Sequence, residues 1–355
     1  MMNREDYIGG SISTRIYEQN LLTRNDLERL NDYDSLEEVL NALNDSVYRD
    51  SINSLNRVEE YEKILDNELK RVYNLIEDTA NNRWILQFLR ERYNFHNLKV
   101  AVKEVIQKEN YSHLYSDLAN IDIAYIKKNL LAGESESTNF LESLNIEGYT
   151  PFNSVYNEND DYLYYARHAI RKFEETNDPR DIDTILDQYY YDNLLYDADK
   201  LGIEDVKDFT KERIDLINTK TLLRVKSQGL GVDDLRSALI EGGNIGLDRF
   251  IDGFNSDLNG LVVKSSNDKI NKYLVNTLDD SKSLDQNLLD LEKAIDDHFM
   301  DYSRKAKAST FGPEVLMNYV ISKETEVKNL RIILVSKLNS LPKEFTEERL
   351  RETYV

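Results

Sequence analysis

The chain has 355 residues, a formal net charge of −21, 40% hydrophobic and 31% charged residues, and no cysteine. The negative charge argues against nucleic-acid and anionic-membrane partners, because phosphate groups repel such a surface, and it favours basic protein partners. The lack of cysteine excludes disulfides, thiolate zinc sites and cysteine nucleophiles, and no run approaches the roughly 20 apolar residues of a membrane span, so we expect no direct membrane insertion.

The N-terminal half of the chain begins with a polar segment and continues with helical periodicity. Residues 1–10 contain three charged residues and no apolar core, so we predict no signal peptide. In residues 57–78 apolar residues recur at steps of three or four, which forms one stripe of an α-helix, and residues 36–43 and 321–338 show the same pattern. No Asn-Gly hairpin turn sits between alternating strands. The sequence therefore predicts an all-α fold.

Two segments interrupt this periodicity. Residues 133–161 are rich in Gly, Ser, Asn and acidic residues, and residues 229–260 hold seven of the thirteen glycines. Such clusters are typical of connections between helical bundles, so we predict three related bundles, of which the first and last can share packing. The predicted parts are residues 1–135, 136–240 and 241–355.

A short pattern recurs once in each predicted part. An acidic or amide residue is followed after three positions by Asn and after two more by Lys or Arg, and an apolar helical segment follows. The three asparagines lie 121 and 111 residues apart. The nine positions are Asn94, Asn97 and Lys99, then Asp215, Asn218 and Lys220, then Glu326, Asn329 and Arg331.

This pattern has a physical interpretation. Residues three apart share one helix face, so the acidic or amide side chain and the Asn can hydrogen-bond the same neighbouring element. Asn is a poor helix former and needs a compensating partner inside a helix. We predict that Asn97, Asn218 and Asn329 pin the helices of each bundle by the same polar contact. Chance is the alternative, because the pattern is degenerate in a chain rich in Asn and charge.

Catalytic and metal-binding motifs are incomplete in this sequence. The acidic cluster at residues 296–301 resembles the metal motif of magnesium-dependent helical enzymes, but the second motif that such enzymes need is incomplete at residues 31–35. A solvated helix face explains the cluster better. The four histidines lack metal-ligand spacing, and residues 242–246 lack the Lys-Ser/Thr of a phosphate loop. We predict no catalytic, metal or cofactor-binding residue; a magnesium-dependent helical enzyme is a remote alternative.

The C-terminal region carries a motif that resembles a known family. Its Gly-x-Glu, its Tyr, its Glu-x-x-Asn-Leu-Arg and its closing Leu-Arg-x-x-Tyr are similar to the final segment of the C subunits of V/A-type ATPases, whose eukaryotic members are called d subunits. Val315 stands where the family has Pro, and Asn94 replaces Asp in the similar segment at residues 93–99. The signature residues are Gly312, Glu314, Tyr319, Arg349 and Arg351.

The resemblance implies a fold and a role. The family fold is three helical bundles with pseudo-threefold symmetry around a funnel, which receives the central-shaft subunits D and F and rests on the proteolipid (c/K/L) ring. The resemblance implies a non-catalytic rotor subunit, one copy per complex, on the cytoplasmic face of the membrane, which transmits torque for H+ or Na+ transport and holds no cofactor. A stand-alone acidic helical scaffold is the alternative.

Overall fold

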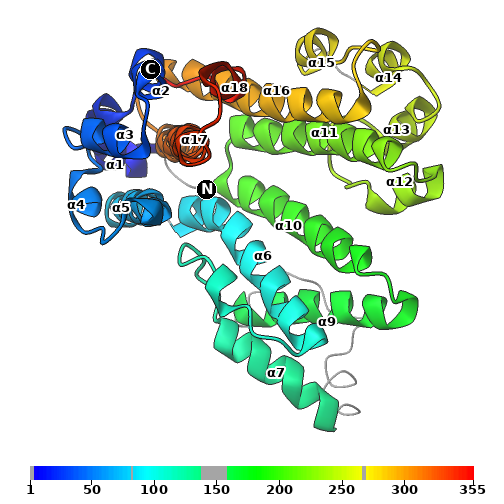
Figure 1. Cartoon of the computed structure of the whole chain (residues 1–355). Helices are drawn as coiled ribbons and strands as arrows, with labels where there is room; N and C mark the ends of the chain where they lie inside the picture. The colour runs from blue at the N-terminus through cyan, green and yellow to red at the C-terminus, as the bar shows by residue number, and fades with distance from the viewer. Residues whose placement is uncertain (1–3, 81–82, 137–157, 266–268) are drawn as a thin grey trace. The chain divides into compact units, whose positions relative to one another are not determined.

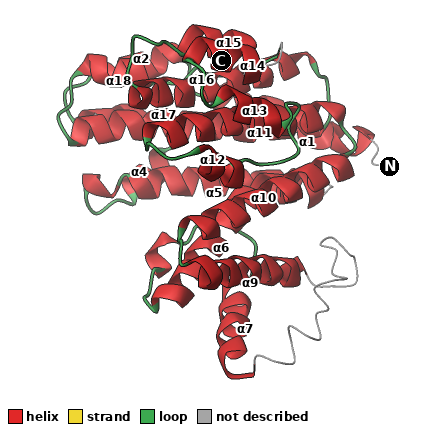
Figure 2. Cartoon of the chain, turned by 90° about the vertical axis from the view of Figure 1, so that its right-hand side faces the viewer, coloured by secondary structure: helices red, strands yellow, loops and turns green. Residues whose placement is uncertain are grey.

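The computed structural model describes residues 4–80, 83–136, 158–265 and 269–355. Every regular element in these ranges is an α-helix or a short 3-10 helix (Figure 2), which confirms the predicted all-α class. No helix within them is long and apolar enough to cross a lipid bilayer. The pseudo-threefold arrangement around a funnel stays a prediction.

The chain forms two compact units, a larger one of Met1–Leu86 and Asp197–Val355 and a smaller one of Gln87–Tyr196. The predicted division into three bundles stays a prediction. The helices α6 (Arg83–Gln107) and α10 (Arg180–Leu201) each have residues in both units. The other elements of the smaller unit are η4 (Ser112–Leu114), α7 (Ile123–Glu136) and α9 (Glu158–Thr176). Those of the larger unit are η1 (Arg4–Tyr7), α1 (Ile8–Tyr17), η2 (Glu18–Asn20), α2 (Arg24–Asp32), α3 (Leu36–Leu43), α4 (Arg49–Asn53), η3 (Val58–Glu60), α5 (Glu62–Thr79), α11 (Glu204–Ser227), α12 (Val232–Ala238), α13 (Leu247–Gly253), α14 (Leu258–Ser265), α15 (Asn271–Thr277), α16 (Leu284–Lys305), η5 (Ala306–Ala308), α17 (Pro313–Leu338) and α18 (Lys343–Arg349).

The helix α17 is the core of one part of the larger unit (Figure 1). It is buried on several sides because α1, α2, α3, α5, α16 and α18 all pack against it. Two of these neighbours are the amphipathic helices that the sequence predicts, since residues 36–43 form α3 and most of residues 57–78 form α5. The predicted helix at residues 321–338 is the C-terminal part of α17.

The second part of the larger unit is built on the pair α11 and α16, with the short helices α12 to α15 beside it (Figure 1). The glycine-rich segment at residues 229–260, predicted as a connection, contains α12, α13 and the start of α14. Gly231 and Gly246 are the N-cap residues of α12 and α13. These glycines therefore separate short helices. The other predicted connection, residues 133–161, lies largely outside the described residues.

The smaller unit has an aromatic core. The Phe95 ring centroid lies 5.6 Å from that of Tyr162, 5.8 Å from Tyr165 and 5.7 Å from Tyr190. All four rings are buried, and they bring α6, α9 and α10 together. Aromatic pairs at these separations stabilise a core beyond the apolar area that they bury.

Candidate functional site

The three asparagines of the recurring pattern make the same pair of hydrogen bonds on three long helices, α6, α11 and α17. In each case the side-chain Oδ1 accepts from a backbone N–H, and Nδ2 donates to the carbonyl of that same residue, at 2.7 to 3.1 Å. The target residue lies 19, 22 or 22 positions further along the chain. An amide side chain thereby satisfies both backbone groups of one residue in the returning segment. The pairs are Asn97 with Ser116, Asn218 with Ile240, and Asn329 with Arg351.

The residue three positions before each asparagine also accepts a backbone N–H. Asn94 accepts from Asn120 at 2.9 Å, in the segment that Asn97 contacts. Asp215 accepts the N–H of Ile245 at 3.0 Å. Ile245 lies a few residues beyond Ile240, which Asn218 holds. A Cβ atom on Gly243 would lie 2.2 Å from Asp215 Oδ1, so glycine is required for this approach. In these two repeats both side chains therefore hold the same returning segment, as the spacing predicts.

The third repeat differs at this position. Glu326 Oε2 accepts the N–H of Leu22, at 2.6 Å, whereas Asn329 holds Arg351. The two polar side chains therefore bind opposite ends of the chain to one helix. The prediction that both side chains bind the same neighbouring element is therefore wrong for this repeat, because Glu326 and Asn329 hold separate segments.

The cation two positions after each asparagine pairs with an acid from another helix. Lys99 Nζ lies 2.7 Å from Asp187 of α10, and Lys220 Nζ lies 2.6 Å from Glu292 of α16. The Arg331 guanidinium contacts Glu62 of α5 at 2.9 Å. The side chains in these pairs are partly exposed, so each pair contributes at most about 1 kcal/mol to stability.

A fourth repeated position, six residues before each asparagine, was not predicted from the sequence. Glu91, Glu212 and Lys323 occupy it, and they are 1%, 5% and 0% exposed. A charge at the same offset in all three parts was the available signal. A buried charge is costly unless it is paired or neutralised, so each of these positions constrains the residues around it.

Lys323 is the centre of a buried ion cluster in the larger unit. Its Nζ lies 2.7 Å from Glu326 and 3.1 Å from Glu68, and both carboxylates are also buried. Glu326 accepts from the Tyr48 hydroxyl at 2.6 Å, and Glu68 pairs with Arg71 at 2.7 Å. Burial alone would lower the pKa of Lys323, but the two carboxylates outweigh it and raise that pKa. The cluster therefore joins α5, α17 and the segment just before α4 through charged contacts.

Glu212, on α11, has two basic side chains as partners. Its carboxylate lies 2.8 Å from His298 Nε2 of α16 and 3.1 Å from Lys269 Nζ. Burial would raise the pKa of Glu212, but the hydrogen bonds from His298 and Lys269 lower it below its ordinary value. The pair explains why a histidine is buried on α16.

Glu91 lies in a network of uncharged polar groups in the smaller unit. The Tyr162 hydroxyl donates to its carboxyl group at 2.6 Å, and Gln87 and Asn193 also donate to it. Asn94 donates to the same Tyr162 hydroxyl at 3.0 Å. Burial raises the pKa of Glu91 to about 7, against the hydrogen bonds, which act to lower it. The carboxyl group therefore changes charge close to neutral pH.

The first signature residues tie the N-terminus to the start of α17. Gly312, with φ of +145°, precedes the helix, and its N–H donates to Ser11 Oγ at 3.1 Å. Arg4 forms an ion pair with Glu314 and donates to the carbonyl of Phe311 at 2.9 Å. A Cβ on Gly312 would meet the Glu314 carboxylate, so this turn requires glycine.

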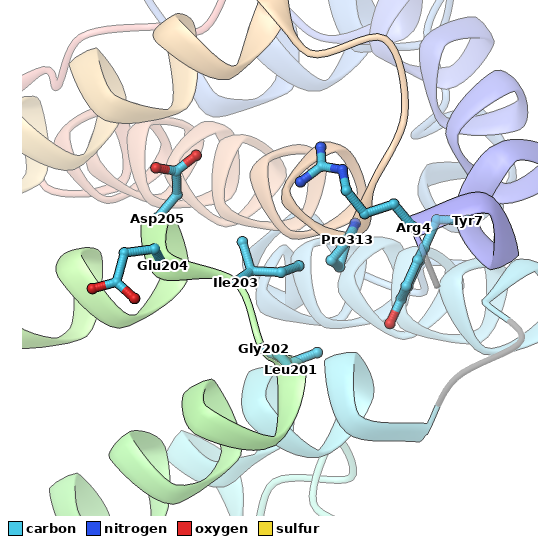
Figure 3. Close-up of a pocket in the computed structure, with 8 residues that line it drawn as sticks. All are labelled: Arg4, Tyr7, Leu201, Gly202, Ile203, Glu204, Asp205 and Pro313. Carbon is cyan, nitrogen blue, oxygen red and sulfur yellow. The ribbon is translucent and has the colours of Figure 1, made fainter. Parts of the chain in front are cut away.

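A cavity of about 270 Å³ lies beside this turn (Figure 3). Arg4 and Tyr7 line it from the N-terminal segment, residues 201–205 from the end of α10 to the start of α11, and Pro313 from the first turn of α17. Its charged groups are Arg4, Glu204 and Asp205, and no serine, histidine or lysine is among the described residues that line it. The lining offers polar contacts but no nucleophile paired with a base.

Of the remaining signature residues, Arg351 holds the C-terminal segment, whereas Tyr319 and Arg349 have other surroundings. Tyr319 is 1% exposed within α17. The Arg349 guanidinium lies over the Phe345 ring, 3.5 Å from its centroid. Arg351 Nε donates to Asp296 of α16 at 2.9 Å, while Asn329 holds the Arg351 backbone.

The acidic cluster at residues 296–301 is more than the solvated helix face that the sequence suggested. Asp296 pairs with both Lys328 and Arg351, and Asp297 accepts the N–H of Glu352 at 2.7 Å. Asp301 pairs with Arg304 at 3.1 Å. Within the described ranges, no group of three or more His, Asp or Glu residues is arranged to hold a metal ion. Asp296 and Asp297 fix the C-terminal segment against α16, and Asp296 also holds α17 through Lys328.

Comparison with known proteins gives a consistent result over nearly the whole chain. The profile of the ATP synthase (C/AC39) subunit family matches residues 13–349. The C subunit of the V-type sodium ATPase of Enterococcus hirae is 23% identical over 341 residues, which cover 95% of each chain. The C subunit of the A-type ATP synthase of Thermoplasma volcanium is 24% identical over 359 residues, covering 95% of this chain and 96% of that one. That of a Desulfurococcus species is 26% identical over 326 residues, covering 89% and 82%.

Replacing Asn329 with Leu tests the asparagine contacts. We expect Asn329→Leu to lower the free energy of unfolding by about 1–3 kcal/mol, because it leaves both backbone groups of Arg351 unsatisfied in a buried place. Urea denaturation followed by circular dichroism measures the loss. Asn53→Leu, at an exposed position on α4, is the control and should change stability by less than about 0.5 kcal/mol. Equal stability of the two variants would contradict the assigned role.

Lys323→Met should lower the free energy of unfolding more than Asn329→Leu does. It leaves the Glu326 and Glu68 carboxylates buried without their common cation, and we expect a loss of about 3–5 kcal/mol. Adding Glu326→Gln should recover part of that loss, because it removes one of the unpaired charges. Lys63→Met, which disturbs an exposed pair with Glu60, is the control with an effect below about 1 kcal/mol. Strict additivity in the double variant would argue against direct coupling.

The buried Glu91 predicts a pH dependence of stability. Its pKa is about 7 when folded and 4.5 in the reference state, so the folded state loses stability as pH rises from about 4.5 to above 7. The shift corresponds to about 3 kcal/mol at pH 8. Glu91→Gln should therefore stabilise the protein at pH 8 and leave it nearly unchanged at pH 4, as measured by urea denaturation at both values. A variant that is less stable than the wild type at pH 8 would refute this assignment.

Proposed function

Because the chain belongs to the ATP synthase (C/AC39) subunit family, we propose that it is the non-catalytic rotor subunit of a V/A-type rotary ATPase or ATP synthase. In this role it is a socket that couples the central-shaft subunits D and F to the proteolipid ring. The observation that carries the proposal is the family match over residues 13–349, since it spans nearly all of the given sequence. One copy per complex would turn with the shaft on the cytoplasmic face of the membrane.

The internal contacts of the larger unit support a mechanical role. A part that transmits torque must resist relative movement of its helices, and close-packed interiors with satisfied polar networks do so. The Lys323 cluster and the Glu212–His298 pair join elements distant in the sequence, and Asn218 and Asn329 each hold a returning segment 22 residues further along. Such contacts stiffen a helical body without any catalytic group.

The recurring pattern supports three related bundles, at residues 1–135, 136–240 and 241–355, around a funnel. Each proposed bundle contains one long helix with an asparagine that holds a returning segment, a residue three positions earlier that accepts an N–H, and a cation two positions later. Three equivalent helices are what an approximately threefold socket requires. The net charge of −21 would complement basic residues of the shaft or of the ring loops.

Copurification with a tagged chain from cells that produce the whole complex tests the assembly. We expect subunits D and F and the proteolipid ring to copurify, with the yield of the shaft subunits falling as salt rises, because charge attraction is screened. Binding that ignores salt would remove the electrostatic part of the proposal. A monomer that binds neither partner would favour the stand-alone scaffold.

A rotation assay on the same complex separates rotor from stator. The chain has no cysteine, so Asp45→Cys gives it a single labelling site. The Asp45 side chain is almost fully exposed, so a label can reach this position. With the catalytic head fixed to a surface, a gold rod on this cysteine should rotate when ATP is added. A stationary rod on a complex whose labelled shaft rotates would refute the rotor assignment and leave the copurification intact.

A further inference from the structure

An open groove lies between α16, α17 and α18 in the larger unit. Its volume is about 500 Å³, and its apolar lining is Leu289, Ile332, Val335, Leu341 and Phe345. Leu289 is 51% exposed and Phe345 37% exposed, so the groove opens at the protein surface. Exposed apolar side chains grouped in this way are typical of a protein-binding surface.

The charge around this groove differs from that of the whole chain. Five basic and three acidic residues line it, whereas the chain carries −21. Lys328 and Arg351 share the single carboxylate of Asp296, Arg331 pairs with Glu62, and Arg349 lies 3.8 Å from the Glu348 carboxylate. Lys293 donates to the carbonyl of Glu348. The groove therefore keeps a local surplus of positive charge beside its apolar floor.

The composition of the rim also fits a protein partner. Arg349 is a signature residue, and its guanidinium lies over the ring of Phe345, four positions earlier in α18. Arginine and aromatic side chains are enriched at the energetic centres of protein interfaces. A floor between helices that presents aliphatic and aromatic groups receives the apolar face of an amphipathic helix.

We propose that this groove, which runs between α16, α17 and α18, binds an amphipathic helix of a partner protein whose flanks are acidic. The apolar face of that helix would rest on Leu289, Ile332 and Phe345, and its carboxylates would face Lys293 and Arg349. Charge complementarity favours an acidic helix over a basic one, because the five basic residues of the lining outnumber its three acidic ones. The inference does not depend on the rotor role.

A peptide-binding experiment tests the proposal on the full chain. The probe is a fluorescent helical peptide of about 18 residues, about 27 Å long, with leucines on one face and glutamates on both flanks. A matched peptide carries lysine in place of every glutamate. Fluorescence anisotropy at low salt should show the glutamate peptide binding at least about tenfold more tightly than the lysine peptide.

Variants locate the binding to the groove. Phe345→Asp should weaken binding of the glutamate peptide about tenfold, because it puts a charge into the apolar lining. Lys293→Glu should weaken binding of the glutamate peptide to a similar degree, because it reverses a lining charge, and it should strengthen binding of the lysine peptide. Val275→Asp, on α15 at a position 57% exposed, is the matched control and should bind as the wild type does. If thermal melting shows that Phe345→Asp disturbs folding, the charge reversal at Lys293 decides the question.

Three results would overturn the proposal. Equal binding of the two peptides would show that charge does not select the partner. Unchanged binding by Phe345→Asp and Lys293→Glu would place the peptide elsewhere. Self-association of the wild type in sedimentation experiments, lost in Phe345→Asp, would identify a second copy of this chain as the occupant.

Discussion

The ammonium group of Lys323, enclosed in the larger unit, is the constraint on which much of that unit depends. A fully buried cation is tolerated only with carboxylates at contact distance, and here they come from Glu68 on α5 and Glu326 on α17. Glu326 also accepts from Tyr48 and from the backbone of Leu22. One charge thereby fixes the relative positions of four segments that are distant in the sequence.

The other two long helices also carry a buried acidic residue six positions before the asparagine, but its charge is compensated differently. Glu212 keeps its charge because His298 and Lys269 pair with it, while Glu91 lies among neutral donors and has a raised pKa. Pairing makes a charged contact that holds two helices together. Neutralisation makes a contact whose strength depends on pH. The three repeats therefore share positions on a helix but not one electrostatic solution.

The C-terminal segment brings the architectural and the surface features together. Asn329 holds the backbone of Arg351, and Asp296 holds its side chain, so the last residues are fixed against α16 and α17. Arg349 and Phe345, in the short helix just before these residues, line the groove. In the proposed rotor, a stiff body and a defined partner surface would follow from one set of contacts.

Periodicity and spacing are local properties. The helical class, the helix at residues 36–43, most of the helix at residues 57–78 and the C-terminal part of α17 were therefore predictable from the sequence, and the recurring pattern could be found there. The sequence also indicated the family through the residues from Gly312 to Arg351. Only the tertiary structure identified Ser116, Ile240 and Arg351 as the targets of the asparagines, since a backbone N–H and carbonyl carry no side-chain signature. The tertiary structure also shows that Lys323 is buried and that Asp296 binds Arg351, because the partners of a charge depend on how distant segments pack.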